Sequence, residues 1–145
     1  MITVKDILQS KGHDVATITP QTTVYDALKI MADKNIGALV VLEGEQVVGI
    51  MSERDYARKV ILHGRSSREL QVREIMTSRV YYVRPDQSVQ DCMAQITDKH
   101  VRHLPVLVED RLAGIISIGD VVKAIIEDQK STIKLLENYI TGAPN

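Results

Sequence analysis

The chain contains the stretch Gly49-Ile50-Met51-Ser52-Glu53-Arg54-Asp55 and, 65 residues later, the stretch Gly114-Ile115-Ile116-Ser117-Ile118-Gly119-Asp120. In both, a β-rich apolar run ends at a serine, and an aspartate follows the serine by three residues. This pattern is typical of a helix start, because the serine accepts a hydrogen bond from a backbone N–H of the first helical turn. Each stretch therefore predicts a strand that leads directly into a helix.

These two stretches belong to an internal repeat. When the sequence is shifted by 65 residues, residues 20–61 fall on residues 85–126 without a gap, and thirteen of the 42 pairs are identical. Ordinary composition would give about three identities. Upstream, residues 4–7 are similar to residues 72–75, so the first copy has three extra residues around positions 11–13, which we expect in a loop. The chain is therefore a duplication.

Each copy predicts the order strand, helix, strand, strand, helix. The first strands are expected at residues 15–18 and 80–83, and the first helices begin at Thr23 and Ser88. Hairpins follow, at residues 39–51 and 104–116. We expect the last helix of the first copy to end at Gly64 and that of the second to run on to Gly142. One copy of about 60 residues buries too little surface to be stable alone, so the two must pack as one body.

Composition excludes several classes of protein. The chain has 18 Lys and Arg against 19 Asp and Glu, so no overall positive field attracts nucleic acid or anionic lipid. Cys92 is the single cysteine, which excludes a disulfide framework and a multi-cysteine zinc site and fits a reducing compartment. The N-terminus lacks the apolar stretch of a signal peptide, and apolar runs such as residues 36–42 are too short to span a membrane. We expect a folded cytoplasmic protein that binds neither nucleic acid nor membrane.

The repeated pattern resembles the cystathionine β-synthase (CBS) domain family. The resemblance rests on the two Gly-x-x-Ser-x-x-Asp stretches and on Arg102-His103-Leu104-Pro105-Val106, which is close to a strand signature of that family. It implies an α/β (α+β) fold, a tandem CBS-domain pair or Bateman module of two β-α-β-β-α repeats related by a pseudo-twofold axis. We expect the first repeat, which includes an N-terminal helix, to span residues 1–66, the second repeat to span residues 67–128, and a helical extension to span residues 129–145.

The resemblance also implies a ligand. Members of the family commonly bind adenosine-containing molecules in two clefts between the repeats: AMP, ADP, ATP, S-adenosylmethionine or nicotinamide dinucleotides such as NAD. Asp55 and Asp120 can each accept hydrogen bonds from both hydroxyls of a ribose, and a helix N-terminus favours a phosphate. The alternative is that each Ser-x-x-Asp only caps its helix. The ligand contacts implied are Thr17, Ile18, Ala38, Ser52, Arg54, Asp55, Tyr82, Arg102, His103, Leu104, Pro105, Ser117 and Asp120.

The two clefts are not expected to be equivalent. Arg102 and His103 offer two donors toward the phosphates, whereas the matching Gly37 and Ala38 offer no side-chain charge. We therefore expect the Asp55 cleft to be richer in phosphate ligands and to suit a diphosphate. Two simpler interpretations stay open: Arg102 and His103 are solvated residues at the end of a strand, and the Lys and Arg residues of the segment 54–68 form a solvated face or bind an acidic partner. Tyr82 either stacks on adenine or packs in the core.

Three functions are compatible with the sequence. The first is a non-catalytic regulatory module that senses an adenosyl ligand and acts in trans on an unidentified effector protein. The second is a purely structural dimerisation module with empty clefts. The third, an enzyme acting on the nucleotide, is disfavoured because the chain has no P-loop, no nucleophile elbow and no set of metal ligands, so that neither a catalytic residue nor a metal is assigned.

The C-terminal extension carries a further expectation. Apolar residues keep helical spacing beyond the end of the repeat at Ile126, namely at Ile133, Leu136 and Ile140. This apolar stripe either folds back on the chain's own core or packs against a second copy. A twofold dimer would bury both stripes at once, so we expect a homodimer.

Overall fold

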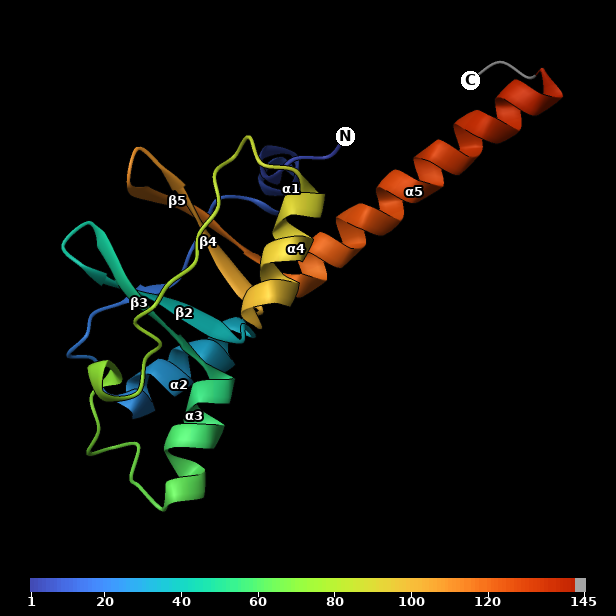
Figure 1. Ribbon diagram of the computed structural model, residues 1–145. Helices are drawn as coiled ribbons and strands as arrows, with labels where there is room; N and C mark the ends of the chain where they lie inside the picture. The colour runs from blue at the N-terminus through green and yellow to red at the C-terminus, as the bar shows by residue number, and fades with distance from the viewer. Residues whose placement is uncertain (143–145) are drawn as a thin grey trace.

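The computed structural model describes residues 1–142 and shows two α+β halves with a long helix projecting from one of them (Figure 1). The elements in chain order are α1 (Val4–Lys11), β1 (Thr17–Ile18), α2 (Val24–Lys34), β2 (Ala38–Glu43), β3 (Gln46–Ser52), α3 (Glu53–Lys59), η1 (Ile61–His63), η2 (Val72–Glu74), α4 (Val89–Lys99), β4 (His103–Val108), β5 (Arg111–Ser117) and α5 (Ile118–Thr141). The expected fold class is confirmed.

The two hairpins share their pairing register. In the first repeat β2 pairs antiparallel with β3, and β1 adds a parallel strand on the other side of β2. In the second repeat β4 pairs with β5 in the matching register, and both hairpins carry a bulge at the same place, after Val41 and after Val106. The duplication seen in the sequence is therefore a structural one.

The strand expected at residues 80–83 is wrong. Only an isolated parallel bridge forms there, between Val83 and Val106. In the first repeat the backbone N–H of Val40 donates to Ala16, but the matching residue of the second repeat is Pro105, which has no N–H. The loss of this hydrogen bond reduces the strand to one bridge. In the first repeat β1 is also shorter than the expected residues 15–18.

The last helix of each repeat starts where the sequence predicted. Ser52 caps α3 and Ser117 caps α5. However, α3 ends at Lys59, not at Gly64, because the chain turns at the fully buried Val60 into η1, and Gly64 ends that turn with a φ of 65°. The last helix of the second repeat, α5, ends at Thr141 and has Gly142 as its C-cap, as expected. Within the described residues it leaves the body and does not fold back on it (Figure 1). Residues 143–145 of the expected extension lie outside the described residues.

The two hydrophobic cores exchange segments. The core of the second repeat includes Val4, Ile7 and Leu8 from α1, whereas the core of the first includes Val72 and Ile75 from the start of the second copy. Cys92 is fully buried in the second core, where burial raises the pKa of its thiol to about 11. Cys92 is therefore a residue of the hydrophobic core.

The contact between α1 and β5 can be tested at Gly114. A Cβ there would lie 2.7 Å from Cδ2 of the buried Leu8. We therefore expect Gly114→Ala to lower the free energy of unfolding by roughly 1–3 kcal/mol in a denaturant titration. Gly119→Ala is the matched control, because its Cβ would come no closer than 3.6 Å to Ser117 Oγ. Equal stability of Gly114→Ala and the parent would contradict this packing.

Candidate functional site

A cleft of about 850 Å³ lies between the two repeats. The first repeat contributes the end of β3 and helix α3, and the second contributes the segment before Val83, the end of α4 and the start of β4. Its lining residues are Gly37, Ile50, Ser52, Glu53, Arg54, Asp55, Arg58, Lys59, Thr77, Arg79, Val80, Tyr81, Lys99, His100, Val101, Arg102 and His103. The site is therefore built by both copies of the duplication.

Asp55 is the buried carboxylate of this cleft, with 8% of its surface exposed. Its Oδ2 accepts hydrogen bonds from the backbone N–H and the hydroxyl of Ser52, at 3.0 and 3.1 Å. Its Oδ1 accepts from Thr77 Oγ1 at 3.1 Å and lies 3.0 Å from Lys59 Nζ. Ser52 and Asp55 therefore form the capping box that the sequence predicted at the start of α3. Because Asp55 also lines the cleft, the capping role does not remove it from the site.

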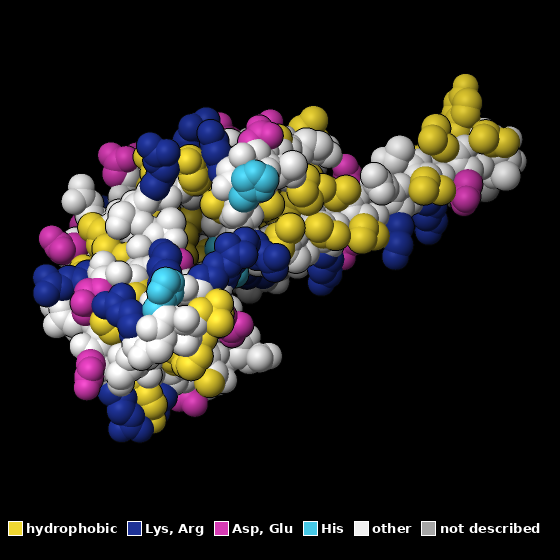
Figure 2. All heavy atoms as spheres, turned by 60° about the horizontal axis from the view of Figure 1, so that its bottom comes forward, with side chains coloured by type: hydrophobic (Ala, Val, Ile, Leu, Met, Phe, Trp, Pro, Cys, Tyr) yellow, Lys and Arg dark blue, Asp and Glu magenta, His cyan; other side chains and the backbone are white. Residues whose placement is uncertain are grey.

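Positive charge dominates the lining. Six Lys or Arg residues face two acidic residues, and two histidines add further donors. Lys99 also lies over the ring of Tyr81, with its Nζ 5.4 Å from the ring centre. Figure 2 shows Lys and Arg side chains spread over this face of the body. A concave surface of this charge favours an anionic ligand.

His103 lies at the boundary between the two repeats. A Cβ added to Gly37 would be 3.9 Å from His103 Cε1, an ordinary van der Waals contact, so Gly37 and the imidazole are neighbours across this boundary. Burial is the main cause that lowers the pKa of His103, with Lys11 and Arg102 acting in the same direction and Asp120 against it. The imidazole is therefore neutral at pH 7 and ready to gain a proton when negative charge approaches.

The carboxylate of the second repeat has a different environment. Lys11, the last residue of α1, donates to Asp120 Oδ2 at 2.6 Å and to the carbonyl of Ile115 at 2.9 Å. Burial alone would raise the pKa of Asp120, but the hydrogen bonds from Lys11 and Ser117 outweigh it and lower that pKa. Lys11 was expected in a loop. The structure corrects this, because the helix continues through Lys11 and ends at Gly12.

The structure brings five of the sequence-predicted residues together in the cleft: Ser52, Arg54, Asp55, Arg102 and His103. The other eight lie outside its lining, namely Thr17, Ile18, Ala38, Tyr82, Leu104, Pro105, Ser117 and Asp120. Among these, Ala38, Leu104 and Pro105 are buried, and Tyr82 is 53% exposed, which excludes its expected alternative role in the core. Arg102, His103 and Gly37 all line the cleft, while the role of Arg102 and His103 as donors to phosphates stays a prediction.

Sequence reasoning missed most of the other lining residues, among them Thr77, Arg79, Tyr81 and Lys99. The signal for Arg79 was present, because Lys11 and Arg79 match at the offset that aligns residues 4–7 with 72–75. Both therefore carry a cation to the same relative place in the fold. Tyr81 was missed in favour of its neighbour Tyr82, a difference of one residue in a segment that forms no strand.

Neither a metal site nor a membrane span is found in the part of the chain that the structure describes. Among residues 1–142, no group of three or more His, Cys, Asp and Glu side chains is placed to hold a metal ion. Over the same residues, no helix is both long enough and apolar enough to cross a bilayer.

Comparison with known proteins finds a matching family and similar structures. The model of the CBS domain family matches residues 4–61 and 72–127. A candidate signal-transduction protein with CBS domains from Burkholderia ambifaria is 52% identical, with a TM-score of 0.84 over 88% of this chain and 96% of that one. The mitochondrial CBS domain-containing protein CBSX3 of Arabidopsis thaliana is 41% identical over 97% of this chain and 72% of its own.

One further neighbour carries ligands. The CBS domain pair of protein MJ0100, in complex with 5′-methylthioadenosine and S-adenosyl-L-methionine, superposes with a TM-score of 0.78 over 88% of this chain and 98% of that one. The two chains are 23% identical, so this likeness shows the shared fold.

The ion pair between Lys11 and Asp120 can be tested by titration. We expect Lys11→Met to raise the pKa of the Asp120 carboxyl, because the variant removes the hydrogen bond that lowers this pKa most. NMR of the carboxyl carbon measures the pKa. A carboxyl whose pKa is lowered by folding stabilises the fold at pH values above 3.8, its pKa in the unfolded chain. This stabilisation is lost as the pH falls through the pKa of the folded state. The variant should therefore lose less stability in acid, by under about 1 kcal/mol for this partly exposed pair.

The matched control is Lys5→Met, which removes an exposed lysine from the same helix. An Asp120 carboxyl that titrates identically in Lys11→Met and in Lys5→Met would show that Lys11 does not hold it.

Proposed function

This chain belongs to the CBS domain family, and we propose that it is a non-catalytic regulatory module that senses an adenine nucleotide with at least two phosphates, such as ADP, ATP or NAD. The observation that carries the proposal is the cleft in which a buried aspartate and six cationic side chains come together from both repeats. A carboxylate recognises the two hydroxyls of a ribose, and the cations recognise the phosphates. Both halves of such a ligand therefore find a partner in one cleft.

The charge of the cleft selects among adenosyl ligands. S-adenosyl-L-methionine is present with the MJ0100 pair, and this supports an adenosyl ligand for the fold in general. Its sulfonium carries a positive charge, however, and this cleft has six Lys or Arg against two acids. A polyphosphate gains from these side chains, whereas a sulfonium is repelled by them. We therefore rank nucleoside diphosphates, triphosphates and dinucleotides above S-adenosylmethionine, with AMP between them.

We expect one nucleotide per chain. Asp120 corresponds to Asp55, and each carboxylate is paired with a lysine, Asp120 with Lys11 and Asp55 with Lys59. Only Asp55, however, lines the cleft in which cationic side chains of both repeats gather. The cleft at Asp55 is therefore the sensing site of the proposal.

The output of the module requires a partner. No constellation of nucleophile, base and orienting group stands out among the residues that line the cleft. In this proposal the module acts in trans on an effector protein, as a homodimer, without a metal, in the reducing environment of the cytoplasm. A structural dimerisation module with empty clefts is the alternative that the ligand experiment decides.

The site assignment is tested by Asp55→Ala. Loss of charge-assisted hydrogen bonds to the ribose should weaken binding of ADP by about 10- to 150-fold, corresponding to roughly 1.5–3 kcal/mol. Isothermal titration calorimetry measures the change, and thermal melting without nucleotide checks that the variant folds. Asp120→Ala is the matched control, with affinity and stoichiometry as in the parent. If the parent binds no nucleotide, the sensing function fails; if both variants bind like the parent, the site is elsewhere.

A pH dependence follows from His103. Its pKa is lowered in the free protein, chiefly by burial, and a phosphate in the cleft would raise it by stabilising the imidazolium. Binding then takes up a proton, so ADP affinity should rise as the pH falls from about 7.5 to about 6. We expect His103→Gln to remove this rise. Calorimetry in buffers of different ionisation enthalpy measures the proton uptake directly, and zero uptake by the parent would refute the role of His103.

A further inference from the structure

The outer half of α5 exposes apolar side chains that the body does not cover. Beyond Ile126 the helix projects away from both repeats (Figure 1). Ile133 is 54% exposed, Leu136 57% and Ile140 80%. Side chains of this size and exposure at regular spacing are typical of an interaction surface and not of a solvated helix.

The exposed residues form one straight stripe. Its members are separated by four, three, four, three and four residues: Val122, Ile126, Gln129, Ile133, Leu136 and Ile140. This is the spacing of the a and d positions of a coiled coil, and on an α-helix it keeps all six within about 40° of one line. Leu135, although 54% exposed, lies on the opposite side of the helix.

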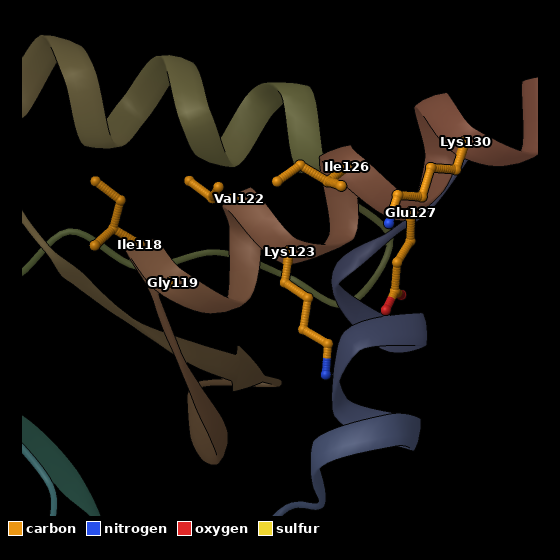
Figure 3. Close-up of a pocket in the computed structure, with 7 residues that line it drawn as sticks. All are labelled: Ile118, Gly119, Val122, Lys123, Ile126, Glu127 and Lys130. Atoms are coloured by element: carbon orange, nitrogen blue, oxygen red, sulfur yellow. The ribbon is translucent and has the colours of Figure 1, made fainter. Parts of the chain in front are cut away.

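The stripe begins on the body itself. A shallow hollow of about 630 Å³ runs along the first turns of α5, and Ile118, Val122 and Ile126 form its apolar side. Figure 3 shows these three side chains along one side of α5, while Lys123 and Glu127 point toward the side on which α1 lies. In Figure 2, hydrophobic side chains gather where the projecting helix leaves the body and again at its far end. The hollow and the projecting stripe are one continuous surface.

We propose that the α5 helix of a second copy covers this surface in the antiparallel direction, so that two chains form a two-helix coiled coil. In this register Val122 packs against the partner's Ile140, Ile126 against the partner's Leu136, and Gln129 against the partner's Ile133. By symmetry each layer occurs twice, and the tip of each helix fills the hollow on the other body. The proposal makes the assembly of the proposed homodimer specific, but it does not depend on nucleotide binding.

Charge selects this direction. The positions that flank the stripe on one side are Lys123, Lys130 and Glu137. In the antiparallel register these positions face one another, so that Lys123 lies beside the partner's Glu137 at both ends of the coiled coil. One repulsive contact remains, between the two copies of Lys130 at the twofold axis. In a parallel pair these positions would face Ile118, Ile125 and Thr132, and no opposite charges would meet. The antiparallel register also places Tyr139, 88% exposed in the single chain, over the partner's Ile125.

The antiparallel arrangement also accommodates the two bodies. Each body surrounds the first half of its own α5, where Val121 and Ala124 are buried. Antiparallel helices place the two bodies at opposite ends of the coiled coil, whereas parallel helices would bring both bodies to the same end. The free half of each helix is therefore available to the other body.

Two neighbouring leucines provide the first test. Leu135 and Leu136 have nearly equal exposure, but only Leu136 lies in the stripe. Sedimentation equilibrium of the full chain should show a dimer whose dissociation constant rises by at least about tenfold in Leu136→Ser and by less than about twofold in Leu135→Ser. Both variants should still bind ADP, because no residue of the stripe lines the Asp55 cleft.

The outcomes are distinguishable. A parent that is monomeric at all concentrations overturns the homodimer and this register together. A dimer that Leu136→Ser leaves unchanged overturns the coiled coil alone, and neither result bears on nucleotide sensing.

Disulfide trapping tests the direction. In the full chain with Cys92 left buried, the double variant Val122→Cys with Ile140→Cys should form a covalent dimer under mild oxidation, whereas each single variant should not. A parallel pair would instead cross-link each single variant to itself, and this result would overturn the proposal. Glu137→Lys should weaken the dimer, and adding Lys123→Glu should restore it, because the exchanged charges again meet their opposites.

Discussion

The exchange of segments between the two repeats is the constraint on which the rest of the structure depends. The backbone N–H of Val4 donates to Gln87 at 2.9 Å, and in the matching place Val72 donates to Thr22 at 2.8 Å. Each copy thus completes the core of the other, which is why neither would be expected to fold alone. The same exchange carries Thr77 and Arg79 to Asp55, and Lys11 to Asp120. Both carboxylates therefore lie in composite sites that exist only when the two repeats are joined.

Within this symmetric frame, a few side chains make the clefts unequal. Arg102 and His103 replace Gly37 and Ala38, so cationic and imidazole donors reach the Asp55 cleft from the second repeat, whereas Gly37 and Ala38 carry no charged side chain. The carboxylate of Asp120 accepts a hydrogen bond from the ammonium group of Lys11, which lies at the end of the exchanged helix α1. Since the backbones match in register and in the position of their bulges, the difference between the surroundings of Asp55 and Asp120 is carried by side chains and not by the fold.

The sequence predicted best what is determined locally. Helix caps at Ser52 and Ser117 and both hairpins follow from residue type and spacing over a few positions. The failures have a tertiary cause: the strand at residues 80–83 was lost because a proline 22 residues beyond Val83 cannot donate a hydrogen bond to it. Lys11 was assigned to a loop because nothing local shows that its partner lies 109 residues away. The repeat made the fold predictable, whereas the residues contributed to each cleft by the other copy could only be seen in three dimensions.

The cleft and the projecting helix are connected by a single residue. The side chain of Arg102 lines the cleft, while its carbonyl accepts a hydrogen bond at 2.8 Å from the backbone N–H of Ile118, the first residue of α5. The first repeat has the matching bond, from Glu53 to Gly37 at 3.1 Å, but Gly37 carries no side chain that a ligand could hold. A phosphate that bound the Arg102 side chain would therefore contact a residue whose backbone holds the start of α5. Because α5 is a single helix of 24 residues, a small change of direction at its start becomes a large displacement at Ile140. Arg102 thus lies at the point where the lining of the cleft meets the start of the helix on which two copies would meet.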